Sequence, residues 1–113
     1  MMVAWQVTPQ KIDAVVRRVV RAAHPRRIIL FGSAARIGMT RAPHDADFLV
    51  VTRRPIASPR QESVRLRRAL RDFLMPMDIL VVSEHRLRML ANQPGLMYRE
   101  ALRGGRVVYE ARA

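Results

Sequence analysis

Three short, nearly continuous apolar runs limit what this chain can fold into. They are RIILF at 27–31, DADFLVV at 45–51 and MDILVV at 77–82. Each has the length of a strand, and a continuous apolar run suits a strand that is covered on both faces. Segments with apolar residues at helical spacing lie around them. The alternation predicts an α/β or α+β fold, with a small mixed central sheet of three to four strands flanked by helices.

Helix signals surround the apolar runs. Thr8-Pro9 predicts a helix start and His24-Pro25 its end. Ser58-Pro59 predicts a second helix, with an apolar face that continues to Leu74. The remaining predicted elements are a short helix at Ala34–Arg36, a helix after Ser83-Glu84, a helix over Pro94–Arg103 and an edge strand at Arg106–Tyr109.

The length and the cysteine count bound the class of protein. A chain of 113 residues is expected to form one domain over residues 1–113. No apolar run approaches the roughly 18 residues that a membrane span needs, and the start lacks the order of a signal peptide. We therefore expect a cytoplasmic protein without a membrane partner. The absence of cysteine excludes disulfides and cysteine-ligated zinc.

The net charge of +12 is extreme for this length, and 20 of the 21 basic residues are arginine. One interpretation is attraction to phosphate, on nucleic acid or on nucleotides, or to an acidic protein. The other is that arginine occupies solvated positions without a binding role. Both interpretations remain open at the level of sequence.

Two aspartates interrupt the second apolar run. Asp45 and Asp47 are two residues apart, so on a strand their side chains share a face, with Cα atoms roughly 6–7 Å apart. Asp78 would join them if the second and third runs form neighbouring strands. Two unit charges 4 Å apart repel by about 4 kcal/mol at an effective dielectric of 20. The pattern therefore predicts a divalent cation, and oxygen ligands favour Mg²⁺ or Mn²⁺ over zinc.

Gly32-Ser33 follows the first apolar run at a predicted strand-to-helix turn. Glycine lets a ligand approach the backbone closely, and free N–H groups with a serine hydroxyl can donate to phosphate. Because Mg²⁺ is commonly held by one or two carboxylates together with substrate phosphates, the two features together indicate a nucleoside triphosphate with its metal. The sequence lacks the second glycine and the lysine of a Walker loop.

Together these residues resemble the minimal nucleotidyltransferase (MNT) domain of the DNA polymerase beta superfamily. The resemblance spans about Val15 to Glu110 and rests on Gly32-Ser33, eleven intervening residues, Asp45-Ala46-Asp47 with Phe48-Leu49-Val50 after it, and later Asp78. It implies a polymerase beta palm-like fold. It also implies that Asp45, Asp47 and Asp78 are catalytic and bind two Mg²⁺ ions, and that Gly32, Ser33 and Arg36 bind the nucleotide.

The chain departs from the family pattern at three places. Arg36 is followed by Ile37-Gly38 where the family usually has Arg-Gly directly, His44 stands where serine is common, and Phe48 replaces an aliphatic residue. The first departure affects the expected loop over the nucleotide. None of the three removes an expected metal ligand.

The resemblance implies a Mg²⁺-dependent transfer of a nucleoside monophosphate, with ATP as the expected donor, to a hydroxyl group. One minimal domain leaves no room for a helical acceptor-binding domain, so the acceptor surface is expected from a partner or from self-association. The family pairs such domains with HEPN-type ribonuclease toxins, and the chain is accordingly expected to act as the antitoxin. The rival hypothesis is a non-catalytic RNA- or protein-binding module with the same fold, and antibiotic nucleotidyl transfer is a third.

Overall fold

The computed structural model describes residues 5–35, 45–90 and 97–112, and the predicted strands and helices occur in it in the predicted order. The elements are α1 (Pro9–Ala23), β1 (Arg27–Phe31), the 3-10 helix η1 (Gly32–Ala35), β2 (Ala46–Thr52), α2 (Pro59–Ala69), β3 (Met77–Ser83), α3 (Glu84–Leu90), α4 (Met97–Gly104) and β4 (Arg106–Glu110). The α/β class predicted from the sequence is confirmed.

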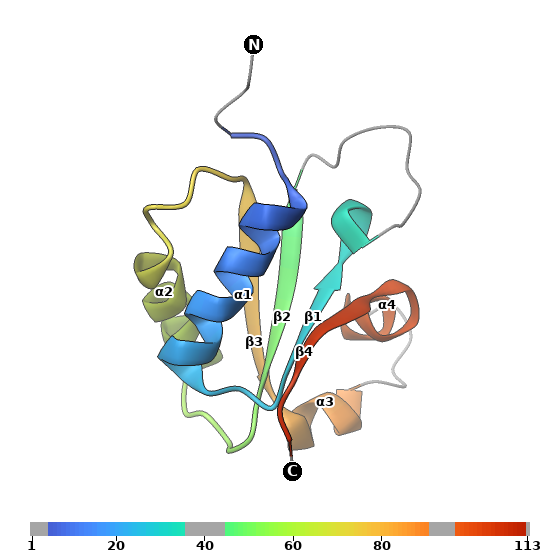
Figure 1. Cartoon of the computed structure of the whole chain (residues 1–113). Helices are drawn as coiled ribbons and strands as arrows, with labels where there is room; N and C mark the ends of the chain where they lie inside the picture. Colours follow the sequence, from blue (N-terminus) through green and yellow to red (C-terminus); the bar gives the residue numbers. More distant parts are fainter. Residues whose placement is uncertain (1–4, 36–44, 91–96, 113) are drawn as a thin grey trace.

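The four strands form one mixed sheet in the order β3-β2-β1-β4 (Figure 1). β1 runs antiparallel to β2 and to β4, whereas β2 and β3 are parallel. Parallel neighbours need a crossover connection, and α2 supplies it between β2 and β3. β3 and β4 are the edge strands of this sheet.

Side chains alternate between the two faces of the sheet, and each face has its own apolar cluster. On one face α1 and α2 cover the strands, with Val15, Val19 and Leu66 fully or almost fully buried. On the other face α3 and α4 contribute Leu87 and Ala101 to a smaller cluster. The larger cluster takes from the strands Ile28, Leu30, Ala46, Phe48, Val50, Ile79 and Val81, and the smaller one takes Ile29, Leu49, Val51 and Val82.

Helix α1 begins and ends where its local sequence predicts. The Thr8 hydroxyl accepts a hydrogen bond from the Lys11 N–H at 3.1 Å, and Pro9 occupies the first turn. His24 ends the helix in the left-handed conformation, at φ 45° and ψ 55°, with its N–H donating to the Val20 carbonyl at 2.9 Å. This cap satisfies one of the terminal carbonyls of the helix.

Helix α2 is shorter than the sequence pattern predicts. We expected its apolar face to reach Leu74, but the helix ends at Ala69 and Leu74 is exposed. Arg18 of α1 donates to the Ala69 carbonyl at 2.7 Å and to the Asp72 carboxylate at 2.9 Å. These contacts satisfy a terminal carbonyl of α2 and hold the turn that follows the helix.

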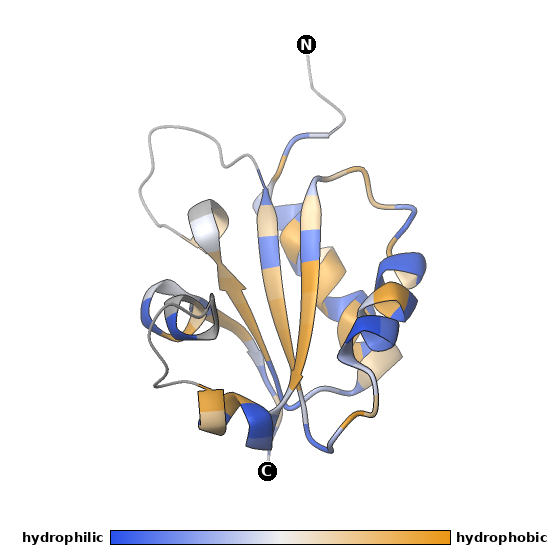
Figure 2. Ribbon diagram, turned by 180° about the vertical axis from the view of Figure 1, so that it is seen from behind, coloured by the Kyte–Doolittle hydropathy of each residue, from blue (hydrophilic) through white to orange (hydrophobic). Residues whose placement is uncertain are grey.

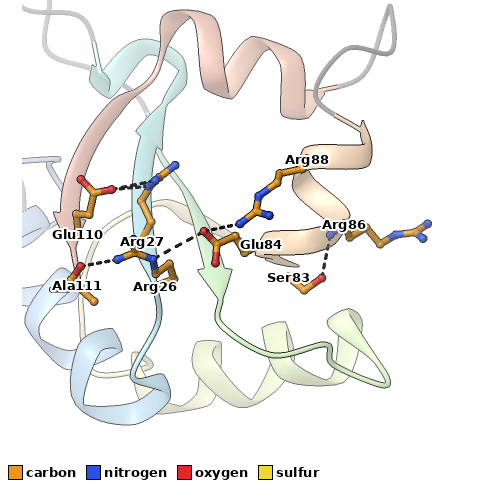
Figure 3. Close-up of polar contacts among 8 residues, drawn as sticks. All are labelled: Arg26, Arg27, Ser83, Glu84, Arg86, Arg88, Glu110 and Ala111. Carbon is orange, nitrogen blue, oxygen red and sulfur yellow. Dashed lines mark hydrogen bonds and ion pairs between the residues drawn. The ribbon is translucent and has the colours of Figure 1, made fainter. Parts of the chain in front are cut away.

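Polar contacts join β4 and α3 to the start of β1 (Figure 3). The Arg26 guanidinium donates to the Ala111 carbonyl and lies 3.8 Å from the Glu84 carboxylate. Arg88 contacts the same Glu84 carboxylate at 3.2 Å, and Arg27 pairs with Glu110 of β4 at 2.9 Å. Several arginines at this end of the sheet therefore already have acceptors.

None of the helices within 5–35, 45–90 and 97–112 is long and apolar enough to cross a membrane.

Candidate active site

The predicted carboxylates meet at one end of the sheet. Asp47 of β2 is the register partner of Asp78 of β3, and on its other side it pairs with Phe31 of β1. All three side chains point to the face that carries α3 and α4. In Figure 2, β2 and β3 are hydrophobic along most of their length and carry a hydrophilic band near one end. The expectation that the second and third apolar runs are neighbouring strands is confirmed.

Gly32 brings the backbone against Asp47. It follows Phe31 directly and has φ +73°, a left-handed conformation that glycine adopts readily. A Cβ atom at this position would lie 2.5 Å from Oδ2 of Asp47, closer than nonbonded atoms approach. The turn after β1 therefore requires glycine for its conformation and for its contact with the carboxylate. A ligand that binds Asp47 would lie next to this turn.

The electrostatic environment disfavours the charge on Asp47. Its side chain is half-buried, and loss of hydration raises the pKa of the Asp47 carboxyl. The neighbouring carboxylates, first Asp78 and then Asp45, raise the same pKa further. A cation beside these groups would relieve both effects, so this arrangement is suited to binding one.

The other predicted site residues have different outcomes. Asp45 lies just before β2 and is exposed, close enough to act on the charge of Asp47. Ser33 follows Gly32 within η1, which begins two residues earlier than the predicted short helix. Arg36 and His44 lie outside the described residues. Phe48, one of the departures from the family pattern, is fully buried on the opposite face and belongs to the core under α1 and α2.

Arg67 is a site residue that the sequence did not reveal. From α2 it donates to Oδ1 of Asp78 at 2.9 Å. Both side chains are more than half exposed, so the pair is worth about 1 kcal/mol or less. Arg67 lies on an arginine-rich helix, and the sequence pattern does not show which of these arginines contacts β3. It could therefore not be predicted as a site residue.

The donor atoms fit a metal that prefers oxygen. Within the described segments, no three histidine, aspartate or glutamate side chains are grouped so as to hold an ion by themselves. Mg²⁺, however, is usually held by one or two carboxylates with substrate phosphates and water completing the shell. Asp47 and Asp78, in register on adjacent strands beside the Gly32 turn, meet that smaller requirement.

Comparison with known proteins assigns no family to this chain. Neither a scan against protein-family models nor a search of curated proteins returned a match to the chain. The resemblance to MNT domains therefore rests on the motif residues of the sequence.

Proposed function

We propose that the protein is a Mg²⁺-dependent nucleotidyltransferase that transfers AMP from ATP to a hydroxyl group of a partner. The observation that carries the proposal is the meeting of Asp47, Asp78 and Gly32 at one end of the sheet. Two carboxylates beside a glycine turn combine a cation site with a place where phosphate can approach the backbone. The order of these elements along the chain is also that of the MNT domain.

In the proposed reaction, the hydroxyl oxygen of the acceptor forms a bond to the α-phosphorus of ATP. The bond from that phosphorus to the oxygen that bridges the α- and β-phosphates breaks, pyrophosphate leaves with that oxygen, and the Asp78 carboxylate would accept the hydroxyl proton. Bound Mg²⁺ would supply polarisation of the phosphoryl oxygens and neutralise the developing charge. Asp45, Asp47 and Asp78 would hold the metal, while the turn at Gly32-Ser33 would orient the triphosphate. Arg36 is expected to add a phosphate contact.

The acceptor is proposed to be a HEPN-type toxin, with this chain as its antitoxin. The support is the resemblance to MNT domains, a family that pairs such domains with HEPN-type toxins. A second copy of the chain would be the alternative source of acceptor surface. The net charge of +12 also suits an RNA-bearing partner.

One observation favours the rival function, a binding module without catalysis. Asp78 is engaged by Arg67, and an ion pair with a protein cation competes with metal binding at that carboxylate. In this alternative the fold is retained, the basic surface binds RNA or protein, and the acidic residues have no chemical role.

Transfer of label from α-labelled ATP tests the two functions. Wild-type protein, Asp47→Ala and the control Asp13→Ala are incubated with Mg²⁺ and a HEPN-type toxin. Asp13 is a suitable control because it is an exposed aspartate on α1 whose ion pair is with Arg17 of the same helix. We expect Asp47→Ala to lose about a thousandfold in rate, since metal stabilisation of transition-state charge is worth several kcal/mol.

Asp13→Ala should transfer label at the wild-type rate. Transfer that survives Asp47→Ala would overturn the assigned mechanism. Binding of the toxin without transfer in any of the three proteins would favour the binding module.

A further inference from the structure

A cavity of about 310 Å³ lies at the opposite end of β2 from the carboxylates. Its wall comes from the end of α1, from the residues that follow β2 and from the first turns of α2. Asp47 and Arg53 are six residues apart on an extended segment, which separates the cavity from the aspartates by roughly 20 Å at about 3.3 Å per residue. The cavity is therefore distinct from the candidate active site. Its volume is at the lower end of small-molecule pockets.

Arginine side chains supply the charge of this cavity. Arg65 is neutralised, because it pairs with Glu62 and donates to the Ala22 carbonyl at 3.0 Å. Arg53 and Arg54 are exposed, and within the described residues their guanidinium groups have no hydrogen bond or ion pair. The nearby Arg26 and Arg27, by contrast, have carboxylate partners (Figure 3). Two uncompensated cations thus line the cavity.

His24 adds a third donor to the same wall. It holds the left-handed cap position of α1, where glycine is the most common residue, and its exposed side chain lines the cavity. An imidazole can donate to a phosphate oxygen, as the two guanidinium groups can. Three donors from two separate segments therefore face one space.

The wall also has an apolar part, beside Thr52 and the Glu62 carboxylate that pairs with Arg65. Ile56 and Ala23 line the cavity and pack against the larger apolar cluster, which lies under α1 and α2. Two hydrogen bonds hold the end of β2 and the residues that follow it. The Arg26 N–H donates to the Val51 carbonyl, and the Thr52 hydroxyl donates to the Arg54 carbonyl, each at 2.8 Å. Guanidinium planes and aliphatic side chains both pack against flat rings. The cavity thus combines sites for an anion and for an uncharged ring.

We propose that this cavity is a second nucleotide site, in which Arg53, Arg54 and His24 hold the phosphate and the nucleoside packs against Ile56. The ligand is a free nucleotide or a nucleotide within an RNA strand, since both present the same phosphate and base. Binding here needs neither Mg²⁺ nor the three aspartates, so the proposal stands or falls separately from nucleotidyl transfer.

Titration of the full chain with AMP and with an adenine hexaribonucleotide, without divalent metal, tests the site. Backbone amide NMR shifts locate the binding and give its dissociation constant. We expect saturable amide shifts at Thr52, Arg53, Arg54, Ile56 and His24. Arg53→Ala/Arg54→Ala should lower the affinity about tenfold or more, because two charge-assisted hydrogen bonds are removed. Both side chains are exposed, so the double variant should keep the wild-type melting temperature.

Arg60→Ala/Arg68→Ala is the matched control. It removes the same charge from exposed positions of α2 that do not line the cavity. Affinity should change less than twofold in this control. An equal loss in both double variants would overturn the proposal, since it would show diffuse attraction to the basic surface. Absence of saturation, or shifts centred on Gly32 and Asp47, would overturn it as well.

The two ligands distinguish the source of the nucleotide. Equal affinity for AMP and the hexaribonucleotide, at the same residues, supports a site for a free nucleotide. Affinity at least tenfold higher for the hexaribonucleotide, again lost in Arg53→Ala/Arg54→Ala, supports a nucleotide within a strand.

Discussion

The two ends of β2 carry opposite charge and are built in different ways. At the first end the backbone register pairs Asp47 of β2 with Asp78 of β3, and Asp45, just before the strand, is close enough to act on the charge of Asp47. At the second end Arg53 and Arg54 follow the strand on long side chains that reach into solvent. The acidic end places like charges close together near apolar neighbours, whereas the arginine side chains of the basic end are exposed to solvent. Like charges held close together repel one another unless a counter-ion binds. The acidic end is therefore the more specific ion-binding site of the two.

The largest effect should come from the glycine turn that shapes the acidic end. Gly32→Ala places a Cβ atom 2.5 Å from Oδ2 of Asp47 and forces alanine into φ +73°. We expect a loss of about 1–3 kcal/mol in the free energy of unfolding, measured by urea denaturation.

Gly104→Ala is the control for this change, because a Cβ atom there meets nothing within 4 Å. It lies at the end of α4, where alanine is the better helix former, so stability should stay equal or rise by up to about 1 kcal/mol. Equal destabilisation by both substitutions would remove the special role of the Gly32 turn.

The raised pKa of Asp47 predicts a dependence of stability on pH. A carboxyl whose pKa is higher in the folded state makes the protein lose stability as pH rises from the ordinary carboxyl value through the folded value. The asparagine side chain of Asp47→Asn cannot ionise, so this variant does not lose stability as pH rises through that range. In EDTA, the variant should melt at a higher temperature than wild type at pH 7, and the difference should shrink towards about pH 4.

Asp72→Asn should show the opposite sign. The hydrogen bond from Arg18 lowers the pKa of Asp72, so this carboxylate stabilises the fold above its unfolded pKa and stops doing so as pH falls through the folded value. Asp72→Asn should therefore melt slightly lower than wild type at pH 7. The same sign for both variants would contradict the proposed difference between the carboxylates.

The smallest effect concerns Arg67, which among the described residues donates to Asp78 at the acidic end. Arg67→Ala frees Asp78 from its ion pair, and we expect Mn²⁺ to bind up to about fivefold more tightly, as an exposed pair worth about 1 kcal/mol or less allows. Electron paramagnetic resonance of free Mn²⁺ measures the affinity. Arg68→Ala, which removes the neighbouring exposed charge, is the control.

Weaker Mn²⁺ binding in Arg67→Ala than in Arg68→Ala would mean that Arg67 holds Asp78 in place for the metal. No change in either variant would show that the ion pair does not limit access to the carboxylate.

The sequence predicted the acidic end well because that end depends on the backbone. Residues two apart on a strand share a face whatever the tertiary structure, and continuous apolar runs identify strands. The pairing of Asp47 with Asp78 required only that the second and third runs be neighbours, and they are. The Gly32 turn was likewise placed from local sequence.

Features that depend on long side chains from other elements could not be predicted. The end of α2 is capped by Arg18, 51 residues before Ala69, which donates to the Ala69 carbonyl. The contact of Arg67 with Asp78 and the convergence of His24 with Arg53 at one cavity also join separate elements. Apolar periodicity indicates which residues face the core. It does not indicate which partner the guanidinium group of an arginine contacts.

The place of β3 at the edge of the sheet gives Asp78 a second consequence, apart from chemistry. The strand MDILVVS is otherwise without charge, and its outer backbone groups are unpaired by any described strand. An apolar edge strand is a template for pairing with other chains, and a charge on it is one of the ways in which proteins prevent this. A charge at Asp78 therefore disfavours edge-to-edge pairing of β3 with other chains, a role that Asp47, inside the sheet, does not have.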